Sequence, residues 1–158
     1  MLKSLRHDVP GNSSTVRRAG QEIEGDCVLQ ILKTYHTASS GKMSLARVWR
    51  GTVKDGLTLN SQRVASVNRM VGQSVTKMSE AVEGDIVALG RMENLKTGDM
   101  VSTSDDVEMP GALAVEVLNP IYSLAVKAES RQDEVKLSDA LHKLREEDRS
   151  LSFEANSE

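Results

Sequence analysis

The sequence predicts a mainly-β protein in which an antiparallel β-barrel is followed by a shorter α+β segment. Short runs of β-type residues recur between residues 26 and 102, and glycine-containing turns separate them. Several short strands at near-regular spacing favour a closed or nearly closed barrel, because curling removes the exposed strand edges. After residue 130 the apolar period changes from two to 3.6, which indicates an amphipathic helix.

Length and composition limit the size of the core. A chain of 158 residues with 39% hydrophobic content buries one ordinary core, or one small domain and part of another. Aromatic residues make up only 3%, so the core must be aliphatic. The single cysteine, Cys27, excludes an internal disulfide, and no apolar run approaches the roughly 20 residues that cross a bilayer. We therefore expect a cytoplasmic protein with no membrane partner.

Residues 1–25 are rich in Gly, Ser, Asn and charge, and we expect a connector there. Residues 26–110 contain the β-type runs and are assigned to the barrel. Within them Lys54-Asp55-Gly56 gives the strongest hairpin signal. In Gly84-Asp85 and Gly98-Asp99, the glycine can adopt the left-handed conformation of a turn, and the Asp carboxylate can accept hydrogen bonds from backbone amides of that turn. We therefore predict that these two Gly-Asp steps have a structural rather than a catalytic role.

Residues 111–158 change character after Pro110-Gly111. Ile121, Leu124 and Val126 suggest a further strand, and Ser130 is a plausible N-cap. A helix of roughly 15 residues should then end near Asp148. Its apolar stripe, at i, i+3, i+4 and i+7, consists of Leu137, Ala140, Leu141 and Leu144.

The residues after this helix, "RSLSF", return to β-like spacing and predict the start of another strand. One helix between two such segments cannot bury its stripe on both sides, so we expect an incomplete domain. The exposed stripe predicts that any dimer is an artefact of truncation.

Charge is distributed unevenly, although the formal net charge is only -3. Residues 33–77 carry one acid, Asp55, and a local charge of +7. Such a stretch indicates an anionic partner such as RNA, although a solvated sheet face remains the alternative. Its eight basic residues are Lys33, Lys42, Arg47, Arg50, Lys54, Arg63, Arg69 and Lys77.

The chain shows no constellation for catalysis. Asp8-Val9-Pro10-Gly11 has the Asp-x-x-Gly pattern of a GTPase switch, but the seven residues before it cannot supply a phosphate-binding loop. The other candidate, Gly41-Lys42, has His36 where the first glycine should stand and Met43 where Ser or Thr should bind magnesium. No Asn-Lys-x-Asp motif occurs. We predict no enzyme activity, no catalytic residue and no nucleotide site in this chain.

A metal site is not expected either. The three histidines are scattered and lack Cys or carboxylate neighbours at ligand spacing. Cys27 begins a β-type run and is predicted to be a small buried hydrophobe rather than a reactive thiol.

Three motifs in a fixed order resemble one protein family. They are "GKMSLARVWRGTVKDGLTL", "EGDIVALGRMENLKTGDMVS" and "NPIYSLAVKAESRQDEVKLSDALHKLREEDRSL". Together they closely resemble the second domain and the beginning of the third domain of elongation factor G and its paralogues among translational GTPases. The resemblance implies an EF-Tu-domain-2-like antiparallel β-barrel, followed by a truncated ferredoxin-like α+β segment.

The same resemblance implies a function without catalysis. In the family the barrel docks on small-subunit ribosomal RNA and on the GTPase domain, so GTP and magnesium would belong to that absent domain. The predicted function is that of a non-catalytic fragment acting in ribosomal translocation or a related step. The candidate residues for RNA or domain contact are Lys42, Arg47, Arg50, Lys54, Arg63 and Arg69.

Two alternatives stay open. The Asp-Pro that follows the helix in the family is Asp148-Arg149 here, so a ribosome-protection or recycling-type relative fits as well as the main translocase. A free-standing RNA- or protein-binding barrel is the second alternative.

Overall fold

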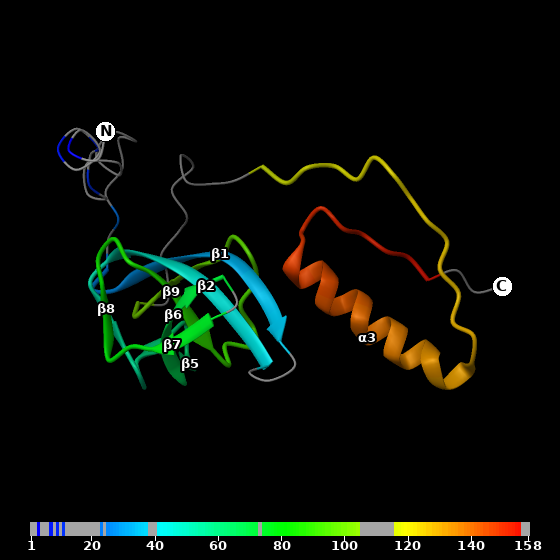
Figure 1. Ribbon diagram of the computed structural model, residues 1–158, viewed down its shortest axis with the longest axis horizontal. Helices are drawn as coiled ribbons and strands as arrows, with labels where there is room; N and C mark the ends of the chain where they lie inside the picture. The colour runs from blue at the N-terminus through cyan, green and yellow to red at the C-terminus, as the bar shows by residue number, and fades with distance from the viewer. Residues whose placement is uncertain are drawn as a thin grey trace.

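The computed structural model describes residues 25–37, 41–72, 74–104 and 116–155, together with residues 3, 7, 9, 11 and 23. Strands β1 to β10 form a curled β structure, and helix α3 lies beside it (Figure 1). The predicted mainly-β fold class is confirmed. The expected connector over residues 1–25 and the break at Pro110-Gly111 fall largely outside the described residues.

The main sheet has six strands in the order β10-β1-β2-β9-β6-β7, and every pairing in it is antiparallel. The longest pair is β1 with β2, and its register shifts twice along β1, between Val28 and Leu29 and between Ile31 and Lys33. Such irregularities increase strand twist and let a sheet curl. The strands are β1 (Val28–Thr37), β2 (Gly41–Arg50), β6 (Ser66–Val71), β7 (Ser74–Lys77), β9 (Ile86–Gly90) and β10 (Met100–Ser102).

Two small sheets complete the wall of the barrel. They pair β3 (Thr52–Lys54) with β8 (Glu80–Val82), and β4 (Thr58–Leu59) with β5 (Gln62–Arg63). The turn after β4 bonds to β10 in both directions, because Asn60 N donates to Ser102 O and Ser102 N donates to Asn60 Oδ1, each at 2.9 Å. Within the described residues no ladder joins β7 to β10, so the barrel is nearly rather than fully closed.

The barrel encloses one aliphatic core, as the scarcity of aromatic residues predicts. Alternate residues of β2 and β9 point inward, and large side chains such as Leu29, Ile31 and Leu89 are fully buried. Cys27 is 4% exposed among them, so its predicted role as a buried hydrophobe is confirmed. The buried cluster contains Cys27, Leu29, Ile31, Ala46, Val48, Val53, Leu59, Val64, Val67, Ala81, Val87, Leu89, Met92, Leu95 and Val101.

The segment Lys54-Asp55-Gly56 forms a turn, but the hairpin expected there is wrong. Gly56 has a φ of +82° and Leu57 N donates to Lys54 O at 3.2 Å, as in a tight turn. The flanking strands do not pair with each other, because β3 pairs with β8 and β4 with β5. The residues of the turn therefore predicted where the chain reverses, but they did not predict which strands pair, because β3 and β4 each pair with another strand.

The two Gly-Asp steps behave as predicted. Gly84 and Gly98 both have a φ of +93°, which an L side chain rarely adopts. Asp85 Oδ2 accepts the amide of Val82 at 3.0 Å, and Asp99 Oδ2 accepts the amide of Lys96 at 2.8 Å. Each carboxylate therefore stabilises the turn that contains it.

Helix α3 (Arg131–Glu147) confirms the predicted helix and both of its ends. Ser130 is the N-cap, and its hydroxyl donates to Asp133 Oδ2 at 2.7 Å. Asp148 is the C-cap, and its amide donates to Leu144 O at 2.8 Å. No residue of α3 is buried, so the predicted apolar stripe remains half-buried or exposed.

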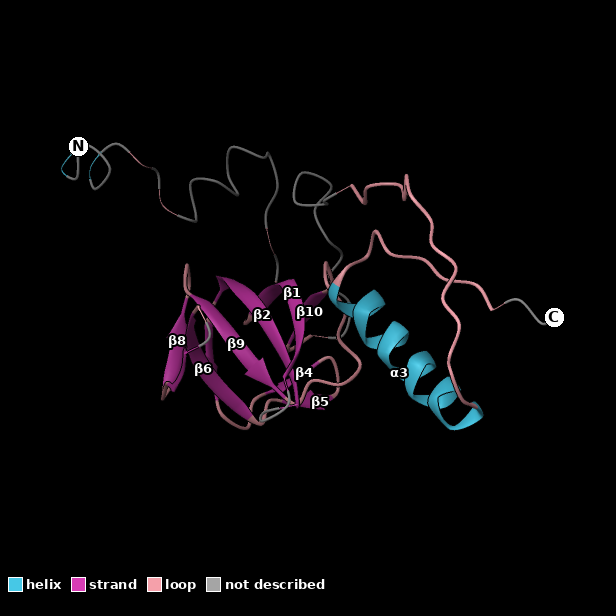
Figure 2. Ribbon diagram, turned by 45° about the vertical axis from the view of Figure 1, so that its right-hand side comes forward, coloured by secondary structure: helices cyan, strands magenta, loops and turns pink. Residues whose placement is uncertain are grey.

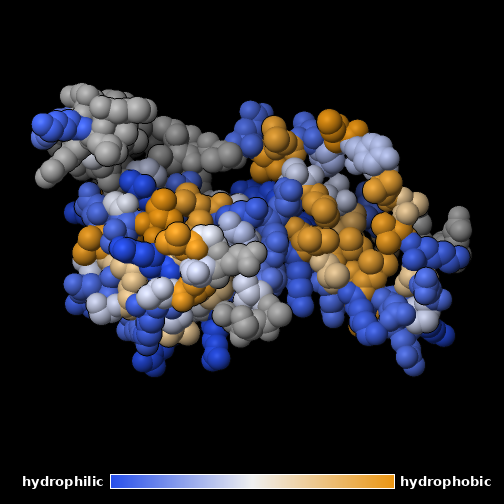
Figure 3. All heavy atoms as spheres, viewed as in Figure 1, coloured by the Kyte–Doolittle hydropathy of each residue, from blue (hydrophilic) through white to orange (hydrophobic). Residues whose placement is uncertain are grey.

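The two strands predicted beside α3 are wrong. Residues 116–128 and 151–155 have no assigned strand, because neither segment pairs with a neighbour among the described residues. Ile121 is 99% exposed and Leu124 is 74% exposed. In Figure 3 apolar side chains gather on α3 and on the chain that passes beside it. Apolar alternation identified residues suited to a strand, but a strand also needs a partner for its backbone groups.

Candidate functional site

The six candidate cations do not converge on one site, because they are spread over β2, β3, β5 and β6. Three are on β2, where strand alternation puts Arg47 on the opposite face from Lys42 and Arg50, and the latter two lie near opposite ends of the strand. Their environments divide them into cations that bond within the fold and cations that face solvent.

Arg47 and Trp49 share the outer face of β2, and the Arg47 guanidinium carbon lies 5.6 Å from the centre of the Trp49 ring. Trp49 Nε1 also donates to Gln30 Oε1 at 3.1 Å, which fixes the ring. Arg50, at the end of the strand, donates from Nη1 to Ile23 O at 2.8 Å. Both arginines therefore contribute to packing at this end of the barrel.

Lys54 and Lys77 have carboxylate partners. Lys54 Nζ lies 3.0 Å from Glu80 Oε2 across the β3–β8 pair, and Lys77 Nζ lies 2.8 Å from Asp55 Oδ2. The hydrogen bond from Lys77, followed by that from the Val67 amide, lowers the pKa of Asp55. Asp55 is the single acid of the basic stretch, and its negative charge is already paired with Lys77 within the barrel.

Arg63 on β5 and Arg69 on β6 are exposed. No carboxylate among the described residues forms an ion pair with either guanidinium. Of the six candidates, these two are the best placed to meet an external anion.

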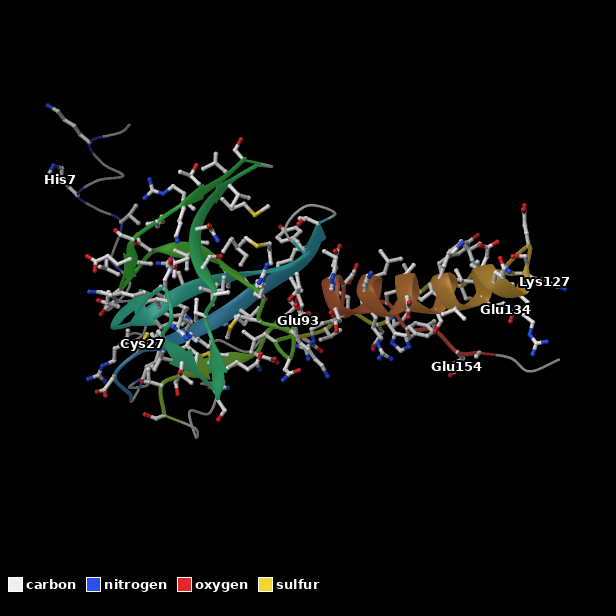
Figure 4. The ribbon with its side chains drawn as sticks, turned by 90° about the horizontal axis from the view of Figure 1, so that it is seen from below. His7, Cys27, Glu93, Lys127, Glu134 and Glu154 are labelled. Carbon is white, nitrogen blue, oxygen red and sulfur yellow. The ribbon has the colours of Figure 1, made fainter. Side chains whose placement is uncertain are left out.

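Lys42, in contrast to the exposed Arg63 and Arg69, is buried, with only 2% of its side chain exposed. Its Nζ donates to Glu93 O at 2.6 Å and lies 3.0 Å from Glu146 Oε2. Glu146 belongs to α3, so this lysine makes a contact between the barrel and the helix. Figure 4 shows Glu93 at the end of the barrel beside α3, whereas Cys27 lies farther from the helix.

Further polar contacts surround Lys42 at this joint. His36 Nε2 lies 2.8 Å from Glu146 Oε2, and the His36 amide donates to Glu147 Oε1 at 2.6 Å. Partial burial would raise the pKa of Glu146, but the hydrogen bonds from Lys42 and His36 outweigh it and hold this pKa below its usual value. Arg149 Nη1 donates to Thr97 O at 3.1 Å on the other side of the joint.

Sequence reasoning missed that Lys42 and His36 both pair with Glu146. Glu146 follows Lys42 by more than one hundred residues, so no local spacing reveals the pair. One signal was available: Lys42 falls in step with Ala46 and Val48, whose side chains face the core, so alternation alone places it on the inner face of β2.

Other chemistry is sparse in the described residues. They contain no group of three His, Cys, Asp or Glu side chains able to hold a metal ion. Burial raises the pKa of the Cys27 thiol to about 11, which disfavours the reactive thiolate. Within the described part of the chain, no helix is both long enough and apolar enough to cross a bilayer.

Family models match most of the chain in two consecutive segments. The model for elongation factor G domain 2 matches residues 27–104, and the model for elongation factor G domain III matches residues 117–158. The two matches have the order expected from the three sequence motifs.

Curated relatives and a solved structure agree with these matches. An elongation factor G-like protein of Synechocystis sp. is 43% identical over 160 residues, covering 100% of this chain and 23% of the relative. Elongation factor G of Jannaschia sp. is 27% identical, covering 94% of this chain and 22% of the relative. A crystal structure of a Thermus thermophilus protein has a TM-score of 0.79 at 24% identity, covering 97% of this chain and 23% of that one.

The chain thus spans about a quarter of the length of the curated relatives that it matches. The structural match supports the fold alone. The resemblance first seen in the motifs is confirmed, and the chain belongs to the elongation factor G-like family.

Proposed function

We propose that this chain is a non-catalytic binding module of an elongation-factor-G-like translational GTPase that acts on the ribosome. The observation that carries the proposal is the consecutive match to elongation factor G domains 2 and III. The proposal assigns residues 1–25 to a connector, residues 26–110 to the barrel and residues 111–158 to the beginning of the next domain. The cytoplasm is the proposed location.

Under this proposal the barrel docks on small-subunit ribosomal RNA and on the GTPase domain of the parent protein. Arg63 and Arg69 are exposed and have no carboxylate partner among the described residues. Cations of this kind neutralise phosphates, and the release of counterions makes the binding weaken as salt rises. Arg47, Arg50 and Lys54 also lie on the barrel, but internal contacts already hold them.

GTP and magnesium would be bound outside this chain. The one loop with a Gly-Lys step does not fit a phosphate cradle, because Gly41 and Lys42 begin strand β2 and the Lys42 ammonium is taken by Glu93 O and Glu146. A phosphate-binding lysine needs a free ammonium at a helix N-terminus or glycine-rich loop. Hydrolysis is therefore proposed for the parent protein and not for these residues.

Co-sedimentation with purified small ribosomal subunits tests the docking role. The double variant Arg63→Glu/Arg69→Glu should lose at least roughly tenfold in affinity, and the remaining binding should depend less steeply on salt. Lys136→Glu/Lys143→Glu is the matched control, because it changes the charge equally on the exposed face of α3. Unchanged ribosome binding by the arginine variant would overturn the assignment of these two residues.

One observation favours a divergent paralogue as the parent. Identity is 43% to the protein named elongation factor G-like and 27% to the one named elongation factor G. We therefore propose a specialised relative, of the ribosome-protection or recycling kind, ahead of the main translocase. Complementation of a strain depleted of elongation factor G by the full-length parent would separate them, since a specialised relative should fail to restore growth.

A further inference from the structure

We propose that Lys42 and Glu146 form a clasp that holds α3 against the barrel, and that opening this clasp exposes Lys42 while the barrel stays folded. The proposal concerns the mechanics of the joint and stands apart from ribosome binding. Under this proposal, the buried Lys42 controls how firmly α3 is held against the barrel.

The clasp lies where the C-terminal turn of α3 meets the barrel, since α3 contacts β1 and Lys42 is near the start of β2. Figure 2 shows α3 beside the barrel, with one end close to the strands. Glu146 and Glu147 on α3 face Lys42 and His36 on the barrel. Thr97 Oγ1 donates to Glu146 O at 3.3 Å, which adds a neutral bond beside the charged pair. Every one of these contacts joins the last turn of the helix to the barrel.

Lys42 depends on the helix for its counterion. Its side chain is 2% exposed, and among the described residues of the barrel the ammonium has one partner, the carbonyl oxygen of Glu93. Glu146 supplies the only carboxylate that pairs with Lys42 among the described residues. Burying a charge without a partner is costly, so release of α3 must be followed by hydration of Lys42.

The joint has little apolar contact to hold it without the clasp. No residue of α3 is buried, so helix burial contributes little hydrophobic stabilisation. A cavity of about 300 Å³ also opens beside Glu146, lined by Lys96, Thr97 and Asp99 from the barrel and by His142 and Arg145 from α3. Polar bonds therefore dominate the joint, and the charged pair is the strongest type among them.

Most of the other charged side chains around the cavity have partners other than Lys42. Asp99 accepts the Lys96 amide, and Glu147 accepts the His36 amide. The Arg149 guanidinium donates to Thr97 O, and Arg145 lies 5.3 Å from the Phe153 ring centre. Glu146 is thus the carboxylate whose loss changes the environment of Lys42 most.

Acetylation of lysines followed by mass spectrometry measures the opening. Lys136 pairs with Asp133 but its side chain is 78% exposed, so it reports the reactivity of a solvent-exposed lysine. The buried Cys27 thiol, labelled in parallel with a maleimide, reports unfolding of the barrel. If Lys42 reacts only in a minor open state, it should be acetylated at least about tenfold more slowly than Lys136. Glu146→Gln should accelerate acetylation of Lys42 several-fold and leave Cys27 protected.

The matched control is Glu134→Gln, which makes the same chemical change at the other end of α3, away from the barrel (Figure 4). It should leave the rate at Lys42 unchanged. The proposal is overturned if Lys42 reacts as fast as Lys136 in the unaltered chain, or if Glu146→Gln has no effect on Lys42. It is also overturned if that variant exposes Lys42 and Cys27 together, because the barrel itself would then be opening.

Discussion

Lys77 Nζ lies 2.8 Å from Asp55 Oδ2, while the other carboxylate oxygen of Asp55 accepts the Val67 amide at 2.7 Å. One aspartate therefore connects the turn after β3 to both β6 and β7. It is also the only acid between residues 33 and 77. Of the eight basic residues in this stretch, Lys77 is the one that pairs with this acid among the described residues.

Replacing Asp55 by Asn should destabilise the barrel at neutral pH and have little effect in acid. The pKa of Asp55 is lowered below 3.8 in the folded state, mainly by Lys77. A lowered pKa means that the stabilisation is complete above pH 3.8 and is lost as the pH falls through the folded-state value. Urea unfolding at about pH 7 and near pH 2 should show the two proteins diverging only at the higher pH.

Glu80→Gln is the control for this prediction. It breaks the exposed Lys54–Glu80 pair, whose atoms lie 3.0 Å apart, and exposed pairs contribute little to stability. A pH-independent difference between Asp55→Asn and the unaltered chain would show that the Asp55 charge is not what stabilises the turn.

How far the sequence predicted the fold depends on whether local chemistry decided each feature. The Gly98-Asp99 turn and the cap at Ser130 need only residues adjacent in sequence, and both were predicted correctly. The hairpin at Asp55-Gly56 was wrong, because β3 finds its partner in β8, nearly thirty residues away. The strand around Ile121 was wrong for the same reason, since pairing requires a distant neighbour.

The same distinction between local and long-range contacts applies to the candidate site. Composition singled out the basic residues as candidates, and strand alternation puts Arg47 and Trp49 on the same face of β2, where they are in contact. Alternation also places Lys42 on the inner face of β2, but neither composition nor alternation could reveal its partner Glu146, because that contact depends on how α3 docks against the barrel. Long-range polar contacts of this kind carry no local sequence signature.

Gly51→Ala should destabilise the protein more than Gly72→Ala, although both glycines have positive φ values of +79° and +59°. The left-handed conformation alone costs an alanine roughly 1–2 kcal/mol. At Gly51 an added Cβ would also overlap the Asp26 carbonyl oxygen and lie 2.9 Å from Cys27 Cα, whereas nothing lies within 4 Å at Gly72. Urea unfolding should separate the two variants by at least about 1 kcal/mol. Equal losses would mean that the backbone near Asp26 yields to the added methyl.

Titration of Cys27 should weaken the barrel at high pH. Burial raises the thiol pKa from 9.0 to about 11 in the folded state, so the unfolded chain loses its proton first. The stabilisation is present below pH 9.0 and is lost as the pH rises toward 11. Between about pH 8 and about pH 10.5, the free energy of unfolding should therefore fall less in Cys27→Ala than in the unaltered chain. Parallel pH curves would show that the thiol stays neutral in both states or is already exposed.

Exposed apolar side chains beside α3 predict self-association of this chain. Leu118 is 78% exposed, Ile121 is 99% exposed and Leu144 is 48% exposed, and such side chains lose contact with water when two copies pair. Sedimentation velocity over a wide range of concentration should detect association, and Leu141→Asp/Leu144→Asp should reduce it. Val71→Asp is a control, because Val71 is 70% exposed but lies on β6, away from the helix.

If the Leu141→Asp/Leu144→Asp variant associates as strongly as the unaltered chain, the stripe on α3 is not the contact surface. If Val71→Asp alone abolishes association, the surface belongs to the barrel.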